Sequence, residues 1–289
     1  MNFDYSEKVL DLIGKLNSFM DENIYPNEAA YAEHFKTTED KWKAAPIMSE
    51  LKSKARDAGL WNLFLPDSKN GAGLNNLEYA PLAEIMGRAP WCSEAFNCSA
   101  PDTGNMEVLD RYGTDEQKEK YLPSLTSGEK IGAFAHSETN TSPTEANISC
   151  SFTGGTLSGT KIAVADGDVA NTFIVTANNG SGVGLYLVDG TADGIEVEPQ
   201  STLDPSRSHA SITFTNTPAT ELKSDWSDVL CLLDRAAVLF SFEQLGGAEA
   251  CMDMAKEYAI GRYAFGRSIA SFQAIKHKLA DMFIAVELA

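Results

Sequence analysis

The first 128 residues carry apolar side chains at helical spacing. Four of them lie three or four positions apart near the start: Leu10, Ile13, Leu16 and Met20. This spacing predicts one apolar face along a helix. Further on, Thr114 is followed three residues later by Gln117, a capping-box pattern that predicts a helix from there to about Pro123. We therefore expect a helical domain over residues 1–128.

From residue 129 to 222 the pattern changes to short runs rich in apolar and β-branched residues. These runs occupy residues 161–164, 171–176, 184–188, 194–197 and 211–214. The sequence Asn-Asn-Gly-Ser-Gly at 178–182 is typical of a turn between two of them. Because no helical run separates these segments, they predict a small antiparallel barrel or sandwich.

Helical spacing returns from residue 223 and continues to Ala289. Gly246 and Gly247 lie inside one long helical run, where each glycine either costs about 1 kcal/mol relative to Ala or lets another backbone come close. The run from Ile269 reaches Ala289 without a helix stop signal. Since a lone apolar helical pair has an uncovered face, we expect a fragment of a longer helical bundle. The predicted class is α+β, with domains at 1–128, 129–222 and 223–289.

Composition narrows the classes of partner. Among 289 residues, 23 are Lys or Arg and 41 are Asp or Glu, so the net charge is −18. This charge repels phosphate backbones and anionic lipid headgroups, which argues against nucleic acid and membrane surfaces. We find no apolar run long enough to span a membrane and no signal-peptide pattern at the start. We expect a cytoplasmic protein.

Cysteine and histidine spacing gives no metal site. The five cysteines form no Cys-x-x-Cys pair, and the four histidines show no i, i+4 spacing. We expect free thiols and no bound metal.

Three segments give the chain a family resemblance. Residues 258–273 read Tyr-Ala-Ile-Gly-Arg-Tyr-Ala-Phe-Gly-Arg-Ser-Ile-Ala-Ser-Phe-Gln. They resemble the Tyr-Ala-x-x-Arg-x-x-Phe-Gly-x-x-Ile-x-x-Phe-Gln segment of acyl-CoA dehydrogenases. Residues 100–107, Ala-Pro-Asp-Thr-Gly-Asn-Met-Glu, and the Gly-Thr-Lys strand at 159–161 are similar to other segments of that family. The resemblance covers essentially the whole chain but only the first part of the C-terminal bundle.

The resemblance implies FAD-dependent α,β-dehydrogenation of an acyl-CoA thioester, with electrons passed to an electron-transfer flavoprotein. Arg262 resembles the arginine that reaches the pyrophosphate of the partner subunit's FAD, a role that suits the planar guanidinium fork. Phe265 and Gln273 match neighbouring contacts to the same half of the cofactor. The family therefore implies a homodimer or a dimer of dimers, with a hetero-oligomer as the alternative.

The residues that match the family's contacts to the flavin ring lie in the middle domain. Ser137 and Glu138 match the start of the family's Thr-Glu-Pro-x-x-Gly-Ser-Asp loop. Phe134, His136, Ser137 and Ala165 are the contacts that the resemblance implies there. His136 is also compatible with a hydrogen-bonded structural histidine.

The segments that match the flavin-ring contacts also depart from the family pattern. Pro143 stands where the family has Ser, which removes one N–H donor. Ala163 and Ala165 stand where the family has the Trp and the Thr of its Trp-Ile-Thr strand. The aromatic side chain and the hydroxyl are therefore missing from this strand.

No catalytic base can be named in this chain. Most members carry the base beyond the position matched by Ala289, and others carry it where this chain has Ala236. Ala237 replaces an arginine that commonly contacts the CoA arm. Asp234 and Arg235 are candidate substrate contacts, and a surface salt bridge explains them equally well.

Two other functions remain open. The chain is also compatible with a non-catalytic partner subunit of a heteromeric acyl-CoA dehydrogenase, which completes another chain's cofactor site. A flavin monooxygenase or nitroalkane oxidase-like relative is the other alternative, because the CoA-contacting arginine is missing.

Overall fold

The computed structural model describes residues 4–38, 44–66, 69–202 and 207–289. The chain forms two compact units. The first comprises the described parts of 1–29, 76–93 and 237–289, and the second those of 30–75 and 94–236. The boundaries expected after residues 128 and 222 remain predictions, although they fall where helix gives way to strand and strand to helix. Within the described ranges, no helix has the length and apolarity needed to cross a membrane.

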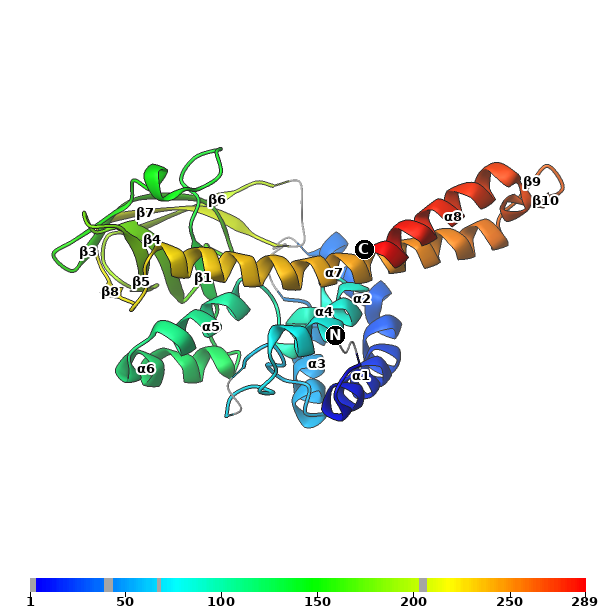
Figure 1. Ribbon diagram of the computed structural model, residues 1–289, viewed down its shortest axis with the longest axis horizontal. Helices are drawn as coiled ribbons and strands as arrows, with labels where there is room; N and C mark the ends of the chain where they lie inside the picture. Colours follow the sequence, from blue (N-terminus) through cyan, green and yellow to red (C-terminus); the bar gives the residue numbers. More distant parts are fainter. Residues whose placement is uncertain (1–3, 39–43, 67–68, 203–206) are drawn as a thin grey trace. The chain divides into compact units, whose positions relative to one another are not determined.

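The first unit is helical. Its elements are α1 (Glu7–Phe19), a π-helical turn (Met20–Ile24), a 3₁₀ turn (Tyr25–Asn27), α4 (Asn76–Gly87), α7 (Trp226–Gly261) from Ala237 onward, the hairpin strands β9 (Tyr263–Ala264) and β10 (Arg267–Ser268), a 3₁₀ turn (Ile269–Ser271) and α8 (Gln273–Leu288). Figure 1 shows α8 turning back after the hairpin. The expected face of α1 is partly wrong: Leu16 and Met20 are buried, but Leu10 is exposed, and Val9 and Leu12 are buried instead.

Helices α4 and α7 approach each other closely within the first unit. A Cβ atom on Gly246 would lie 1.8 Å from the carbonyl oxygen of Glu84, and one on Gly87 would lie 2.0 Å from that of Glu243. Arg88 adds ion pairs across the same two helices, at 3.1 Å to Glu249 and 2.8 Å to Asp253. Helix α7 continues unbroken through Gly246 and Gly247, so close backbone approach is the reason for Gly246.

The helices of the second unit are α2 (Glu28–Thr37) from Ala30 onward, α3 (Pro46–Asp57), a 3₁₀ turn (Cys92–Phe96) from Glu94 onward, α5 (Asp102–Tyr112), α6 (Asp115–Thr126), a 3₁₀ turn (Glu145–Asn147) and the start of α7. The capping box of Thr114 and Gln117 is confirmed at the start of α6. The predicted end at Pro123 is wrong, because α6 continues to Thr126. Pro123 is exposed, so the carbonyl that loses its N–H partner can bind water.

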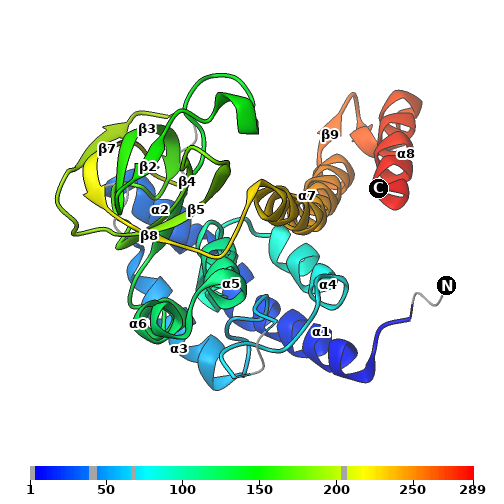
Figure 2. The same ribbon diagram turned by 60° about the vertical axis from the view of Figure 1, so that its left-hand side comes forward.

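The middle of the second unit is one eight-stranded sheet (Figures 1 and 2). Its strands are β1 (Gly132–Ala135), β2 (Ser151–Thr153), β3 (Thr156–Ala165), β4 (Thr172–Asn178), β5 (Val183–Asp189), β6 (Ile195–Gln200), β7 (His209–Pro218) and β8 (Thr220–Glu221). The order is β6-β7-β3-β2-β4-β5-β8, with β1 also paired to β4. Most neighbours are antiparallel as predicted, but β1 and β2 run parallel to β4.

The sheet core determines which side chains of β1 face outward. Ala133 and Ala135 belong to the buried core, together with Phe173 of β4 and Phe214 of β7. Because side chains alternate along a strand, Phe134 lies on the other face of β1.

Asp102, the first residue of α5, connects this helix to β1. Its Oδ1 accepts a hydrogen bond from the backbone N–H of Gly132. Burial raises the pKa of Asp102 from 3.8 to about 7, although this hydrogen bond acts in the opposite direction.

We expect Gly246→Ala to destabilise the protein by about 1 to 3 kcal/mol, because its Cβ has no room beside the Glu84 carbonyl. Gly247→Ala is the matched control: the nearest atom, the carbonyl oxygen of Gly87, is 3.4 Å from the added Cβ. That substitution should leave stability unchanged or raise it by up to about 1 kcal/mol through helix propensity. Urea unfolding measures both, and equal effects of the two substitutions would contradict the close crossing.

We expect Asp102→Asn to flatten the pH dependence of stability. The unfolded carboxyl ionises near pH 4 and the folded one near pH 7, so the free energy of unfolding falls as pH rises between these values. The amide still accepts from Gly132 and carries no charge, so the variant should exceed the wild type at pH 8 by on the order of 2 kcal/mol. Thermal unfolding from pH 4 to 8 measures this, with Asp110→Asn on the same helix as control. Parallel curves for wild type and Asp102→Asn would refute the assignment.

Candidate functional site

The predicted cofactor residues fall into two groups that belong to different units. The flavin-ring candidates lie in the second unit: Phe134, His136, Ser137 and Ala165. The pyrophosphate-side candidates lie in the first unit: Arg262, Phe265 and Gln273.

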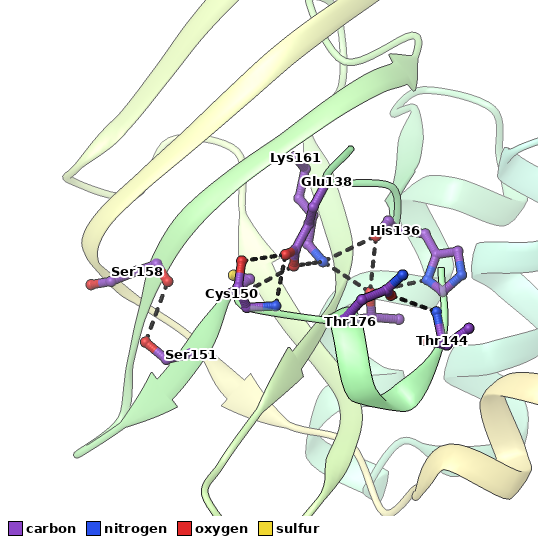
Figure 3. Close-up of polar contacts among 10 residues, drawn as sticks. His136, Glu138, Thr144, Cys150, Ser151, Ser158, Lys161 and Thr176 are labelled. Atoms are coloured by element: carbon purple, nitrogen blue, oxygen red, sulfur yellow. Dashed lines mark hydrogen bonds and ion pairs between the residues drawn. The ribbon is translucent and has the colours of Figure 1, made fainter. Parts of the chain in front are cut away.

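A fully buried lysine lies at the centre of the flavin-ring group. The side chain of Lys161, on β3, has no exposed surface. Its Nζ donates to Glu138 Oε1 at 2.8 Å, to Thr176 Oγ1 at 3.0 Å and to the carbonyl oxygen of His136 at 3.1 Å (Figure 3). These three acceptors match the three protons of an ammonium group, so the buried charge is fully hydrogen-bonded.

Glu138 is held in turn by the chain that follows it. Its carboxylate accepts from the Ser149 backbone N–H at 2.7 Å, from the Ser149 hydroxyl at 2.5 Å and from the Cys150 N–H at 2.9 Å. Burial raises the pKa of Glu138, but the hydrogen bonds from Lys161, Ser149 and Cys150 outweigh it and leave this pKa below its usual value. The ionised carboxylate of Glu138 therefore ties the segment after β1 to Lys161 through one set of hydrogen bonds and to Ser149 and Cys150 through another.

His136 lies close to two aromatic side chains. Its ring stacks on Phe134, with centroids 5.3 Å apart and planes at 15°, and on Trp226, at 6.3 Å and 24°. Its Nδ1 lies 3.0 Å from Thr176 Oγ1. Burial, reinforced by the charge of Lys161, lowers the pKa of His136 to about 4, so the ring is neutral at physiological pH. Among the described residues, its buried Nε2 has no hydrogen-bond partner.

Strand β3 presents small side chains near this group. Its pairing with β7 shifts register between Lys161 and Val164, and Ala163 has a positive φ of 51°. Ala165 is the last residue of β3 and pairs with His209. The backbone N–H of Ile162 donates to the carbonyl oxygen of Ser137 at 2.8 Å, which joins β3 to the segment that carries His136.

The residues present fit a polar, planar cofactor such as FAD in one respect. A buried ring nitrogen without a partner next to Ser137 calls for a ligand atom, because an unmet buried polar group costs about 1 to 3 kcal/mol. Aromatic side chains come from β1 and α7, as Phe134 and Trp226, and not from β3.

The pyrophosphate-side residues lie at and around the hairpin of the first unit. Arg262 directly precedes β9, and its carbonyl accepts from Ile269 N–H at 2.8 Å. Phe265 forms the turn with Gly266, at φ values of 53° and 77°, and is 95% exposed. Arg262 and Gln273 are also exposed. An aromatic ring so exposed, at a φ that bulky residues disfavour, is typical of a contact surface.

The two substrate candidates differ in their surroundings. Arg235 Nη1 lies 3.2 Å from Oε1 of Glu107, a largely buried carboxylate that also pairs with Arg111 at 2.7 Å. Asp234 is exposed. Arg235 therefore takes part in the salt bridge that the sequence left open, and the role of both residues in substrate binding remains a prediction.

Three residues of this site were missed by sequence reasoning: Lys161, Thr176 and Trp226. Lys161 had a detectable signal, because it shares strand parity with the buried Leu157 and therefore points inward. Thr176 and Trp226 had none, since their contacts with His136 join segments far apart in sequence.

The cysteines form no disulfide: Cys92, Cys98 and Cys150 are buried free thiols, Cys231 is half-buried and Cys251 is exposed. In the parts of the chain that the structure describes, no three His, Cys, Asp or Glu side chains gather as a metal site would require.

Comparison with known proteins identifies the family. Residues 7–129 match the family model "Acyl-CoA dehydrogenase, N-terminal domain", and residues 226–289 match "Acyl-CoA dehydrogenase, C-terminal domain". A probable acyl-CoA dehydrogenase, IBR3 of Arabidopsis thaliana, is 31% identical over 330 residues, covering 98% of this chain and 40% of that protein.

Solved structures of acyl-CoA dehydrogenases are also similar to this chain. A putative acyl-CoA dehydrogenase from Mycobacterium abscessus has a TM-score of 0.89 and 30% identity, covering 99% of this chain and 78% of that one. A glutaryl-CoA dehydrogenase from Mycobacterium smegmatis in complex with FADH2 has a TM-score of 0.78 and 22% identity, covering 98% and 75%. The chain spans 40% or less of the first curated relatives that it matches. With its helix–sheet–helix order, the chain belongs to the acyl-CoA dehydrogenase family.

Proposed function

We propose that the protein containing this chain is an FAD-dependent enzyme that dehydrogenates an acyl-CoA thioester between Cα and Cβ and passes electrons to an electron-transfer flavoprotein. One observation within this family carries the proposal: the anchored segment of Glu138 holds a neutral His136 whose Nε2 is buried without a partner. We place this activity in the cytoplasm.

FAD, when bound, supplies the hydride acceptor for oxidation of the Cα–Cβ bond. Phe134, His136, Ser137 and Ala165 bind the flavin-ring side in this proposal. Glu138 and Lys161 hold the backbone of that segment in place, and the rings of Phe134 and Trp226 pack against His136. No residue of this chain is assigned as the base for the α-proton.

The substrate in this proposal is an acyl-CoA thioester, with Asp234 and Arg235 on α7 as contacts. Arg235 keeps its ion pair with Glu107 in this proposal. The ion pair with Glu107 fixes the orientation of the Arg235 guanidinium, so a substrate would meet it in one defined position.

The assembly that we propose is a homodimer or a dimer of dimers in which Arg262, Phe265 and Gln273 complete the FAD site of another subunit. Support comes from the hairpin, which exposes Phe265 at 95% and leaves Arg262 and Gln273 open to a partner. A hetero-oligomer uses the same surface.

A second candidate is a non-catalytic partner subunit that retains the hairpin and lends it to another chain. The methyl side chain of Ala163, exposed on β3, favours it, because this strand offers neither an aromatic ring nor a hydroxyl to a flavin. A flavin monooxygenase or nitroalkane oxidase-like activity is the third candidate.

An anaerobic titration of the full protein with acyl-CoA thioesters of different chain length tests the function. We expect bound flavin to lose its visible absorbance as 2-enoyl-CoA forms, and the α-proton of the substrate to exchange with deuterium from solvent. Flavin that is reduced only by nitroalkanes, or by NAD(P)H for oxygen activation, would favour the third candidate. A folded protein without flavin would favour the second.

Arg262→Met tests the shared cofactor site. The substitution keeps an extended side chain but removes the guanidinium, so we expect FAD to bind about tenfold to hundredfold more weakly, as for loss of a charge-assisted hydrogen bond. Lys256→Met, on the exposed surface of α7, is the control that removes a positive charge nearby in sequence. FAD dissociation constants from flavin fluorescence measure both, and equal affinities in the two variants would remove Arg262 from the site.

A further inference from the structure

The turn between β4 and β5 contains an Asn-Gly pair that the proposed function does not use. Asn179 and Gly180 are exposed, and a Cβ atom added to Gly180 would meet nothing within 4 Å. In an Asn-Gly pair the glycine nitrogen can attack the side-chain amide carbon of the asparagine, because glycine has no side chain to hinder the approach. The turn therefore has the sequence and the open space that spontaneous deamidation needs.

A second Asn-Gly pair in the chain, Asn70–Gly71, is packed far more tightly. A Cβ atom on Gly71 would lie 2.3 Å from the carbonyl oxygen of Leu65 and 2.9 Å from that of Asn62. The carbonyl oxygen of Asn70 also accepts a hydrogen bond from Asn62 Nδ2 at 2.9 Å. Since ring closure must rotate the backbone between the asparagine and the glycine, the packing around Gly71 opposes the reaction at Asn70.

Hydrogen bonds of the turn polarise the amide of Asn179. Its Oδ1 accepts from the Ser181 N–H at 2.9 Å, from the Ser181 hydroxyl at 2.7 Å and from the Gly182 N–H at 3.2 Å. Negative charge develops on this oxygen when the nitrogen attacks, and donors already directed at it lower the barrier. The hydrogen bond from the Gly180 N–H to Asn178 Oδ1, at 2.7 Å, acts in the opposite direction, because it must open before the attack.

We propose that Asn179 deamidates spontaneously in the folded protein, at a rate set by the hydrogen bonds of its turn, and that the product weakens the attachment of strand β8. The Gly180 nitrogen loses its proton to solvent and forms a bond to Cγ of Asn179, and Nδ2 takes up a proton and leaves as ammonia. Water then opens the cyclic imide at either carbonyl and gives aspartate or isoaspartate. The inference is independent of the proposed function, because it involves neither a flavin nor an acyl-CoA.

The new carboxylate faces Glu221 of β8. In the asparagine form, Asn179 Nδ2 donates to Glu221 Oε1 at 3.4 Å, and the hydroxyl of the buried Tyr186 donates to the same oxygen at 3.5 Å. Strand β8 also accepts hydrogen bonds from Gln117 of α6, at Thr220 Oγ1 (3.1 Å) and at the Glu221 carbonyl (3.2 Å). Replacing the Nδ2 donor by a negative oxygen turns attraction into repulsion, so β8 separates from β5 more often.

Peptide mapping by mass spectrometry of the full protein, aged at mildly alkaline pH, tests the reaction. In the folded protein we expect the exchange of NH₂ for OH to be at least about tenfold faster at Asn179 than at Asn70, because only the second pair is held by packing. In urea the two pairs should react at similar rates, because only the shared Asn-Gly sequence remains. Equal rates in the folded protein, or the same ratio in folded and unfolded protein, would overturn the proposal.

Two substitutions test the role of the hydrogen bonds. Ser181→Ala removes a donor to Oδ1 and should slow the reaction about twofold to tenfold, whereas Asn178→Ala releases the Gly180 N–H and should accelerate it by a similar factor. Ser151→Ala is the control, because its hydroxyl donates to the carbonyl oxygen of Ser158 on β3 instead. Unchanged rates in the first two variants would mean that the turn does not set the rate, contrary to the proposal.

Hydrogen–deuterium exchange tests the effect on β8. The Leu222 N–H, directly after β8, donates to the carbonyl oxygen of Leu185 at 2.9 Å. We expect this N–H to exchange about twofold to fivefold faster in Asn179→Asp, as for the loss of one exposed polar pair. Asn179→Gln keeps a neutral amide and should stay near the wild-type rate. Wild-type exchange in the Asn179→Asp variant would contradict the weakening of β8.

Discussion

The ammonium group of Lys161 is the constraint on which the flavin-ring region of this chain depends. A charge with no exposed surface loses several kcal/mol of hydration, and only well-placed acceptors offset that loss. Its three acceptors come from the end of β1, the segment after it and strand β4. Lys161 on β3 therefore fixes three stretches of chain at once. Replacing it by an apolar residue would leave Glu138 buried at 6% exposure with its counter-charge removed.

The hydrogen bonds of Lys161 also reach His136, through the Thr176 hydroxyl and the His136 carbonyl. Thr176 Oγ1 accepts from Lys161, donates to the His136 carbonyl at 3.4 Å and lies 3.0 Å from Nδ1 of the His136 ring, and the same carbonyl also accepts from Lys161. The same ammonium also lowers the pKa of His136, after burial itself, and so keeps the imidazole neutral. The buried cation thus anchors the segment that carries His136 and adds to the effect of burial on the protonation state of its ring.

Sequence reasoning succeeded where the determining interactions are local. The helix–sheet–helix order follows from side-chain periodicity, and the capping box at Thr114 involves residues three positions apart. It failed where tertiary contacts decide. Leu10 and Val9 are both apolar, and only packing selects Val9 as the buried one. Lys161 was missed as a site residue because a strand lysine usually faces water, and its partner Glu138 lies 23 residues away along the chain. The cofactor role that the 258–273 segment predicts for Arg262 stays a prediction, because it involves another subunit.

The small residues of β3 follow from the shape of the strand. Ala163 has a positive φ of 51° at the point where the register with β7 shifts. A bulky or β-branched residue is strained at such a φ, so alanine suits this backbone. Aromatic surface near His136 comes instead from Phe134 on β1 and Trp226 at the start of α7. The polar atom left unpaired beside these rings, among the described residues, is Nε2 of His136, directly after β1.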